Sequence, residues 1–372
     1  MSTTIRLLVV EDDEGQYETY SDTAEELRNG DNGIQFELIR KTSSQDAQIA
    51  LLSNDFDAAI VDLNLDATDS TEASGNDILE KIIGSHRFPV FVVSGNLGKL
   101  NEGIREKESL FLKCYDRDKP NKEIFDEIQN ICGTGITRIL GGRGLIEQKL
   151  AEIFWNHLAG DLDVWLESQN SSEKALLRYT VSHLSEYLDM PSEEKEFYSE
   201  AEFYIKPPIR KTIATGDIVE KDKERFILLS PACDIAIRGS DEEPVINANR
   251  LTLARLIKVD RSSFIENNII KDVTNGSGRE SILKKIIHAQ QDKYIFLPEY
   301  KELDASVVDL QNLYTIDFDQ YRKFYKRIAT IAGPFLKDIQ SRFSSYYGRQ
   351  GQPDLNKDGL LKKHKNDLSG NG

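Results

Sequence analysis

Hydrophobic and polar positions follow a regular series over the first 133 residues. Apolar runs that end at polar residues, together with one alternating segment, predict five strands, at residues 5–10, 33–39, 56–63, 89–93 and 110–115. Between them, apolar residues recur every three or four positions and predict helices at residues 16–28, 44–52, 75–83 and 124–131. Strands that alternate with helices predict an α/β domain with a five-stranded, parallel, doubly wound sheet.

The pattern changes after residue 133. Residues 134–144 are rich in glycine and predict a hinge, with a strand-like stretch at 136–140, and residues 145–168 and 172–188 predict two long amphipathic helices. Short β segments then predict a small barrel or bent sheet, at residues 203–205, 212–213, 217–219, 225–229 and 251–259. Further helices are predicted at residues 279–288, 318–331 and 334–347.

These patterns predict the organisation of the whole chain. The α/β domain covers residues 1–133, the hinge covers 134–144 and a helical segment covers 145–200. An α+β domain follows at residues 201–347. The tail at residues 348–372 is rich in Gly, Lys and Asn, and its composition predicts disorder.

Composition narrows the class of protein. The chain is 39% hydrophobic and 30% charged, which is typical of a globular protein. No apolar run approaches the ~20 residues that a transmembrane helix needs. Three cysteines are too few and too scattered for a disulfide framework or a zinc site. We therefore expect a cytoplasmic protein that does not enter the membrane.

The negative charge is concentrated in the first domain. Residues 1–133 hold 13 Lys and Arg against 27 Asp and Glu, a net charge of −14 out of −16 for the chain. The remaining residues hold 34 against 36, a net of −2. An acidic first domain favours a divalent cation or a basic partner and repels nucleic acid, so a nucleic-acid partner is not indicated.

Polar groups gather where the predicted strands end. Asp62 follows the third strand, Glu11 and Asp12 follow the first, and Ser94 follows the fourth. Since the carboxyl ends of parallel strands share one edge of a sheet, we expect these groups to lie together. Three carboxylates suit Mg²⁺. A hydroxyl and a lysine beside them could hold the oxygens of a phosphoryl group that Asp62 accepts as a nucleophile.

The first domain, over about residues 4–133, resembles the receiver domain of two-component response regulators. The resemblance implies that Glu11 and Asp12 are the metal-site acids and that Asp62 is the phospho-acceptor. The motifs that carry the resemblance are Val9-Val10-Glu11-Asp12, Ile60-Val61-Asp62, Val92-Val93-Ser94 and Lys119-Pro120.

The same resemblance assigns the remaining residues of the site. It implies that the backbone carbonyl of Asn64 binds Mg²⁺ together with the acids. Ser94 would be the switch hydroxyl. Lys119 would contact the phosphate, and the peptide bond between Lys119 and Pro120 would be cis.

Several positions depart from the family pattern. The aromatic switch residue is expected three places before the lysine, whereas Tyr115 lies four places before Lys119. Lys113 is therefore a competing candidate for the lysine of the site. Plain core packing is an alternative role for Tyr115. The loop after Asp62 is lengthened to Gly75 and acidic, with Asp66, Asp69, Glu72 and Asp77. A receiver-like sheet that no longer accepts phosphate is the structural alternative.

The second part offers weaker candidates. The stretch Thr215-Gly216-Asp217-Ile218-Val219, followed by residues 226–230, resembles the opening of small PemK-like toxin barrels, which are endoribonucleases, but a structural turn explains it equally. Cys233 beside Asp234 could be a reactive thiol, although a buried cysteine is the better interpretation because no His lies near it in the sequence. A basic helix face with Arg322/Lys326 and Lys323/Arg327 could contact the acidic domain, nucleic acid or solvent.

Together these features predict a response regulator. A sensor histidine kinase or phosphotransfer protein would phosphorylate Asp62 with Mg²⁺, and the receiver would relay this to an atypical output domain. The resemblance also suggests bacterial stress response or phage defence as a setting, and a second copy of the chain as a partner. The alternatives are a phosphate sink without its own output and a receiver-controlled effector enzyme such as an endoribonuclease.

Overall fold

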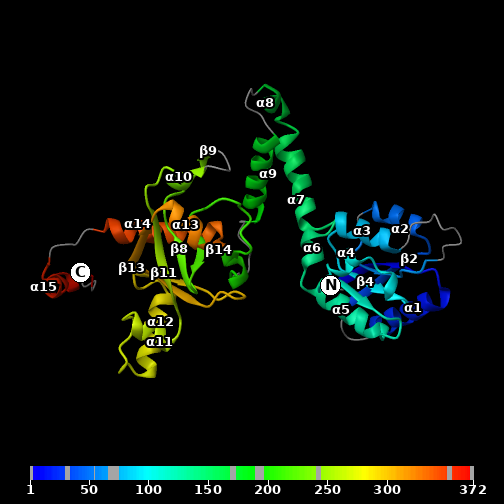
Figure 1. Ribbon diagram of the computed structural model, residues 1–372, viewed down its shortest axis with the longest axis horizontal. Coiled ribbons are helices and arrows are strands. Elements are labelled where there is room, and N and C mark those ends of the chain that lie inside the picture. The colour runs from blue at the N-terminus through cyan, green and yellow to red at the C-terminus, as the bar shows by residue number, and fades with distance from the viewer. Residues whose placement is uncertain are drawn as a thin grey trace. The chain divides into compact units, whose positions relative to one another are not determined.

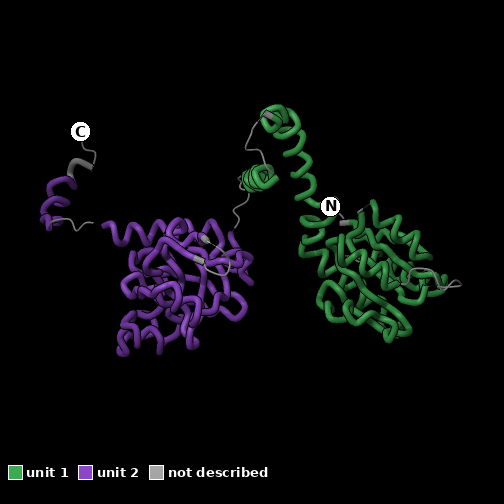
Figure 2. Tube along the Cα trace, turned by 45° about the horizontal axis from the view of Figure 1, so that its top comes forward, with its two compact units in different colours: residues 1–192 green, residues 193–372 purple. Residues whose placement is uncertain are grey.

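The computed structural model describes residues 3–29, 34–53, 55–65, 75–167, 173–188, 197–239, 244–349 and 354–368. The chain divides into two compact units, Met1–Ser192 and Glu193–Gly372 (Figure 2). Within the described residues, no helix is both long enough and apolar enough to cross a membrane.

The first unit is built on a five-stranded parallel sheet (Figure 1). Its strands are β1 (Thr3–Val10), β2 (Ile34–Lys41), β3 (Ala58–Val61), β4 (Val90–Val93) and β5 (Leu112–Tyr115). They lie in the order β2-β1-β3-β4-β5, which is the flavodoxin-like doubly wound order. Every residue of β3 and β4 is buried, because helices cover both faces of the sheet. The predicted fold of this domain is confirmed.

Two hydrophobic clusters lie on opposite faces of this sheet. Leu8 and Val10 pack with α2 (Ser44–Leu51), α3 (Gly75–Ser85) and the four-residue α4 (Glu102–Arg105). The alternate residues Leu7 and Val9 pack with α1 (Glu14–Arg28) and α5 (Asn121–Gly133). Because successive strand residues face opposite sides, one apolar run supplies both clusters. The apolar residues of the strands therefore face the two clusters, and the polar residues that follow the strands lie at the sheet's carboxyl edge.

A chain of helices follows α5, and here two predictions are wrong. Residues 136–140 form the helix α6 (Ile136–Leu140), not a strand, and Gly141 closes it by donating its N–H to the Thr137 carbonyl at 2.8 Å. A Cβ on Gly141 would lie 2.3 Å from that carbonyl oxygen, so only glycine fits. The long helix predicted at 145–168 is divided into three parts: α7 (Leu145–Ile153), a π-helical turn (Phe154–Leu158) and α8 (Leu162–Glu167). The helix α9 (Glu173–Leu188) agrees with prediction.

The second unit contains a seven-stranded antiparallel sheet in the order β12-β13-β11-β8-β7-β14-β6. Its register shifts in β11 and β14, and such bulges bend strands. The result is a curled half-barrel, so the predicted bent sheet is confirmed. The strands are β6 (Tyr204–Ile205), β7 (Asp217–Lys221), β8 (Glu224–Leu228), β11 (Leu251–Lys258), β12 (Tyr294–Leu297), β13 (Ser306–Ile316) and β14 (Lys326–Ile331).

Helices and one small ribbon complete the second unit. The two-stranded ribbon joins β9 (Arg238–Gly239) to β10 (Pro244–Val245). The helices are α10 (Ala232–Ile235), α11 (Arg261–Glu266), α12 (Gly276–Ile287), α13 (Phe318–Phe324), α14 (Gly333–Gly348) and α15 (Lys357–Leu368). Where the sequence predicted a disordered tail, α15 forms, and its described side chains are all exposed.

The helix predicted at 318–331 is wrong in its second half. The helix α13 ends at Phe324, and the residues after Tyr325 form β14. Asp217 explains the difference, because it is fully buried on β7 and needs partners: Arg327 and Thr330, both on β14. Arg327 Nε lies 2.7 Å from an Asp217 carboxylate oxygen.

This strand removes the predicted basic helix face, because Arg322/Lys326 and Lys323/Arg327 no longer share a helix. Residues 212–213, predicted as a strand, are also irregular.

Candidate functional site

Three carboxylates meet at the carboxyl edge of the parallel sheet. Val10 of β1 pairs with Val61 of β3, and this register places Glu11 and Asp12 beside Asp62. One oxygen from each carboxylate lies within 4.8 Å of the others. Glu11 and Asp62 are each only 1% exposed. Carboxylate oxygens at this spacing suit a divalent cation such as Mg²⁺.

Asp62 has two unlike oxygens. Its Oδ2 accepts a hydrogen bond from Arg117 Nη2 at 2.5 Å. Its Oδ1 is buried and has no hydrogen-bond partner among the described residues. A buried carboxylate oxygen left in this way costs free energy unless a cation or donor satisfies it. The residues present therefore fit a bound metal ion.

Glu11 holds its proton more tightly than a free glutamate. Burial raises its pKa to about 7, and the neighbouring Asp62 carboxylate adds to the increase, while the Asp13 N–H and Arg117 oppose it. Without a cation, bringing a second negative charge beside Asp62 is unfavourable. A divalent ion would reverse that balance and favour the ionised carboxylate.

Glu11→Gln is expected to stabilise the metal-free protein at pH 8 but not at pH 4. Since the pKa of Glu11 is raised from 4.5 to about 7 on folding, the folded state keeps a proton that the unfolded state loses, and stability falls as pH rises through this window. The neutral amide of Gln has no proton to lose, so Glu11→Gln should raise the free energy of unfolding at pH 8 by on the order of 2–3 kcal/mol. Urea unfolding in the presence of a chelator, at both pH values, measures the free energy of unfolding of the variant and the wild type. The exposed Glu18→Gln serves as control, and an equal gain at both pH values would contradict the prediction.

Arg40 on β2 positions the acid pair through the backbone. Its Nε donates to the Glu11 carbonyl at 3.1 Å and its Nη2 donates to the Asp12 carbonyl at 2.9 Å. The same guanidinium pairs with Glu14 and lies 4.8 Å from the ring centroid of Tyr17. Nothing in the sequence pattern singled out Arg40, since its role depends on the β1–β2 pairing.

Ser94 lies at the end of β4 and is completely buried. Its Oγ accepts a hydrogen bond from Asn64 Nδ2 at 3.2 Å, and Lys99 Nζ donates to Asn64 Oδ1 at 2.7 Å. A hydroxyl, an amide and an ammonium therefore form a connected network after β3 and β4. The metal role of the Asn64 carbonyl stays a prediction.

Gly75 explains how α3 can begin against the acceptor. A Cβ at this position would lie 2.4 Å from the backbone oxygen of Asp62 and 2.8 Å from Leu63 Cα. Only glycine allows this approach. Of the acidic loop predicted before it, Asp66, Asp69 and Glu72 lie outside the described residues, and Asp77 occupies the first turn of α3.

The cation beside Asp62 is Arg117, which sequence analysis missed. Its guanidinium also lies 3.4 Å from Glu11 Oε1. Lys119, predicted from the resemblance as the phosphate contact, forms an ion pair with Glu123 one turn into α5 and lies 5.2 Å from the Tyr115 ring centroid. Both cations lie in the turn from Asp116 to Lys119, which the Lys119 N–H closes by donating to the Asp116 carbonyl at 3.1 Å.

The predicted cis bond before Pro120 is wrong. The Lys119–Pro120 bond is trans, and the described residues contain one cis peptide bond, Lys206–Pro207. Pro120 instead occupies the N-cap position of α5. The contact between Lys119 and phosphate stays a prediction.

Tyr115 and Lys113 share one partner. The Tyr115 hydroxyl lies 2.8 Å from both carboxylate oxygens of Glu127, and Lys113 Nζ lies 2.5 Å from Glu127 Oε2. The Tyr115 ring stacks on Phe91 with centroids 6.4 Å apart. Lys113 is thus bound to α5 at Glu127, while the switching role of Tyr115 stays a prediction.

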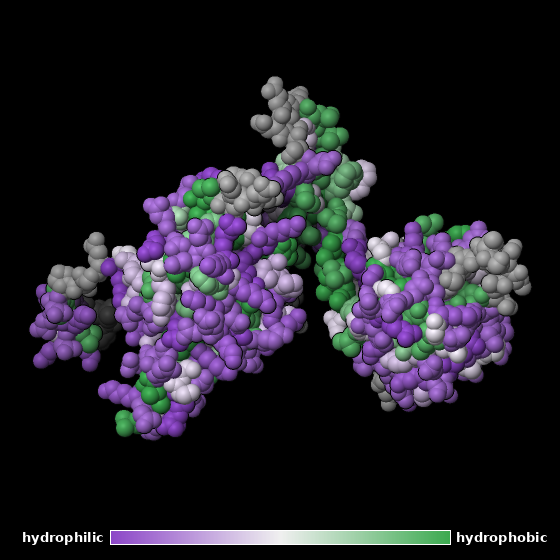
Figure 3. Space-filling view, viewed as in Figure 1, coloured by the Kyte–Doolittle hydropathy of each residue, from purple (hydrophilic) through white to green (hydrophobic). Residues whose placement is uncertain are grey.

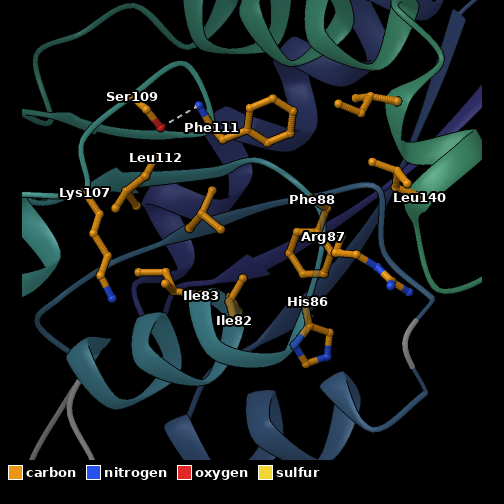
Figure 4. Close-up of a pocket in the computed structure, with 12 residues that line it drawn as sticks. Ile82, Ile83, His86, Arg87, Phe88, Lys107, Ser109, Phe111, Leu112 and Leu140 are labelled. Atoms are coloured by element: carbon orange, nitrogen blue, oxygen red, sulfur yellow. Dashed lines mark hydrogen bonds between the residues drawn. The ribbon is translucent and has the colours of Figure 1, made fainter. Parts of the chain in front are cut away.

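A separate cavity of about 360 Å³ lies near the first residues of β4 and β5, Val90 and Leu112. Figure 4 shows the rings of Phe88 and Phe111 among the side chains that line it. Since these are the amino ends of the strands, the cavity is at the edge opposite Asp62 and takes no part in the acid cluster.

In the second unit, Asp217 has a structural explanation. Besides Arg327, it accepts hydrogen bonds from the Thr330 hydroxyl at 2.7 Å and the Ala214 N–H at 2.7 Å. Gly216 has φ +85° and lies against Leu336. The turn that resembles small toxin barrels is therefore accounted for by packing.

The prediction of a buried Cys233 is wrong, since Cys233 is exposed. Its Sγ lies 3.6 Å from Asp234 Oδ1.

Comparison with solved structures finds proteins that are similar to part of this chain. No protein-family model and no curated protein matches the chain. Several of the similar solved structures are described as response regulators or their receiver domains. One is a putative response regulator from Chloroflexus aurantiacus J-10-fl, 18% identical with TM-score 0.28, covering 35% of this chain and 99% of that one. Another is the receiver domain of a putative Luxo repressor protein from Vibrio parahaemolyticus, 14% identical with TM-score 0.29, covering 36% and 97%.

Proposed function

We propose that the first unit accepts a phosphoryl group on Asp62 in the presence of Mg²⁺, as the receiver of a two-component response regulator. One observation carries the proposal. Asp62 is buried with Oδ1 unsatisfied among the described residues, beside two further carboxylates and one guanidinium. A structural aspartate would have both oxygens satisfied by the protein.

The chain's own residues supply a nucleophile and charge stabilisation. An Asp62 oxygen attacks phosphorus, the P–O bond forms, and the P–N bond of a phosphohistidine donor breaks. The electron pair leaves on the imidazole, which takes up a proton. In this proposal Arg117 and the Ser94 hydroxyl bind phosphoryl oxygens, which requires Arg117 to move off Asp62.

Glu11, Asp12 and Asp62 would hold Mg²⁺. When bound, the ion neutralises the charge that gathers on the transferring group. Arg40 keeps the Glu11 and Asp12 backbone in place meanwhile. Burial of Asp62 and Glu11 limits water at the site and strengthens these interactions.

The partners follow from this chemistry. A sensor histidine kinase or a phosphotransfer protein supplies the phosphoryl group, in the cytoplasm, and the second unit receives the signal as output domain. The acidity of residues 1–133, with its net charge of −14, favours a donor surface with basic groups. A role in bacterial stress response or phage defence is part of the proposal that rests on the resemblance alone.

Incubation with Mg²⁺ and acetyl phosphate tests the proposal. Intact-protein mass spectrometry should show a gain of one phosphoryl group that hydroxylamine removes, since acyl phosphates react with this nucleophile. A chelator should reduce incorporation by on the order of 100-fold or more, because the three carboxylates are then uncompensated. Incorporation that is unaffected by the chelator, or that resists hydroxylamine, would place the phosphate elsewhere and overturn the proposal.

A further inference from the structure

The helix α9 carries an apolar stripe, most of whose side chains are exposed. Leu177, Val181 and Leu188 are 63%, 53% and 59% exposed, and Leu184 is partly buried. Their spacing of four, three and four residues is the a/d pattern of a coiled coil, with Val181 and Leu188 at a and Leu177 and Leu184 at d. A narrow seam of this kind is suited to one partner helix.

The contact of α9 with the rest of the first unit uses a different face. Tyr179, His183 and Tyr187 face the π-helical turn that follows α7: the rings of His157 and His183 have centroids 4.9 Å apart, and His157 Nε2 lies 3.2 Å from the Tyr187 hydroxyl. At about 100° per residue, the seam lies more than a third of a turn from this face. Packing against α7 therefore leaves the seam open.

The surrounding segment is unusually apolar at its surface. Among the described residues from Leu145 to Leu188, ten large apolar side chains are exposed, including Trp155 at 71% and Leu166 at 78%. Figure 3 shows hydrophobic residues gathered along these helices.

We infer that α9 pairs with α9 of a second copy of this chain as a parallel two-stranded coiled coil. The β-branched Val181 at a, with Leu177 and Leu184 at d, favours two strands. In the parallel arrangement, Glu173 at g meets Arg178 at e of the partner copy, twice by symmetry. Both are exposed, and neither forms an ion pair with another described residue. An antiparallel pairing brings e to e and g to g, and leaves these opposite charges apart.

The inference goes beyond the proposed function and does not depend on phosphorylation of Asp62. Dimerisation through α9 would place two receivers and two output units in one particle. The seam ends at Lys174, the next a position, where a charged side chain limits the register in which two helices can pair.

Analytical ultracentrifugation of the full chain, without phosphodonor, tests the inference. The wild type should be a dimer, and Val181→Glu should weaken it about a hundredfold, because two apolar contacts are lost together. Ser182→Glu, at an exposed position outside the seam, is the matched control and should leave the dimer intact. Circular dichroism confirms that each variant folds. A monomeric wild type, including one whose seam is covered by its own second unit, overturns the inference, as does a dimer indifferent to Val181→Glu.

Charge exchange and crosslinking fix the orientation. Glu173→Arg and Arg178→Glu should each weaken the dimer several-fold, and the double variant should restore it. Leu184→Cys in a Cys233→Ser background should crosslink to itself on mild oxidation only in the parallel register. Failure of both the restoration and the crosslink, with a dimer present, would overturn the parallel pairing.

Discussion

Asp62→Asn is expected to abolish the covalent incorporation of phosphate from acetyl phosphate, to below a thousandth of the wild-type level. The amide has the shape of the carboxylate but is not a nucleophile, and no other described carboxylate combines full burial, an unsatisfied oxygen and two neighbouring acids. The substitution therefore removes the nucleophile and keeps the shape of the side chain. Intact mass and a phosphate-affinity gel, both with Mg²⁺, measure incorporation.

A matched control separates the acceptor from acidity in general. Asp118→Asn removes one carboxylate from the same edge, where Asp118 is exposed on the loop after β5. This variant should incorporate phosphate as the wild type does. Equal labelling of wild type and Asp62→Asn would show that the acceptor lies elsewhere. Loss of labelling in Asp118→Asn alone would have the same meaning.

The first domain could be predicted from sequence because its signals are local. Each buried strand is a short apolar run, and each ends at the polar residue that the site uses, as at Asp62 and Ser94. Since parallel strands end at a common edge, chain order alone brought the acids together. The fold and the acid cluster needed no knowledge of side-chain contacts.

The roles of Arg117 and Arg40 were not predicted because each side chain contacts a residue that is distant in the sequence. Arg117 meets Asp62, 55 positions away, and Arg40 meets Glu11, 29 positions away. The chain has 47 Lys and Arg residues, and no local sequence feature distinguishes Arg117 or Arg40 from the others. The signal that could have found Arg117 is its place directly after β5, at the same edge as the acids.

The second unit was harder because its sheet is antiparallel and its contacts are distant. The strands β12 and β13 were not predicted, and the residues of β14 were predicted as helix, where Arg322/Lys326 and Lys323/Arg327 also fit helical spacing. Tertiary pairing with Asp217, 110 positions before Arg327, decides the outcome. Local propensity is a weak guide where a buried charge needs a partner.

Arg117→Ala is expected to slow phosphorylation of Asp62 by on the order of 100-fold, while Lys119→Ala changes it only a few-fold. Arg117 is the cation that contacts both Asp62 and Glu11, whereas Lys119 pairs with Glu123. Removing a charged donor aimed at a transferring group costs about 10²–10³ in rate. Stopped-flow or gel assays of incorporation with excess acetyl phosphate measure both variants, and Arg117→Lys should fall between, since it keeps charge without the planar fork.

A second readout follows from Glu11. The positive charge of Arg117 lowers the pKa of Glu11 against burial and Asp62, which raise it to about 7. In Arg117→Ala that pKa should rise further, so Mg²⁺ binding at pH 7 should weaken and recover at pH 8.5, where Glu11 is ionised again. Lys119→Ala should bind Mg²⁺ as the wild type does at both pH values. If Lys119→Ala instead loses phosphorylation while Arg117→Ala keeps it, Lys119 is the cation that contacts the phosphoryl group, and Arg117 only occupies the acceptor before phosphate arrives.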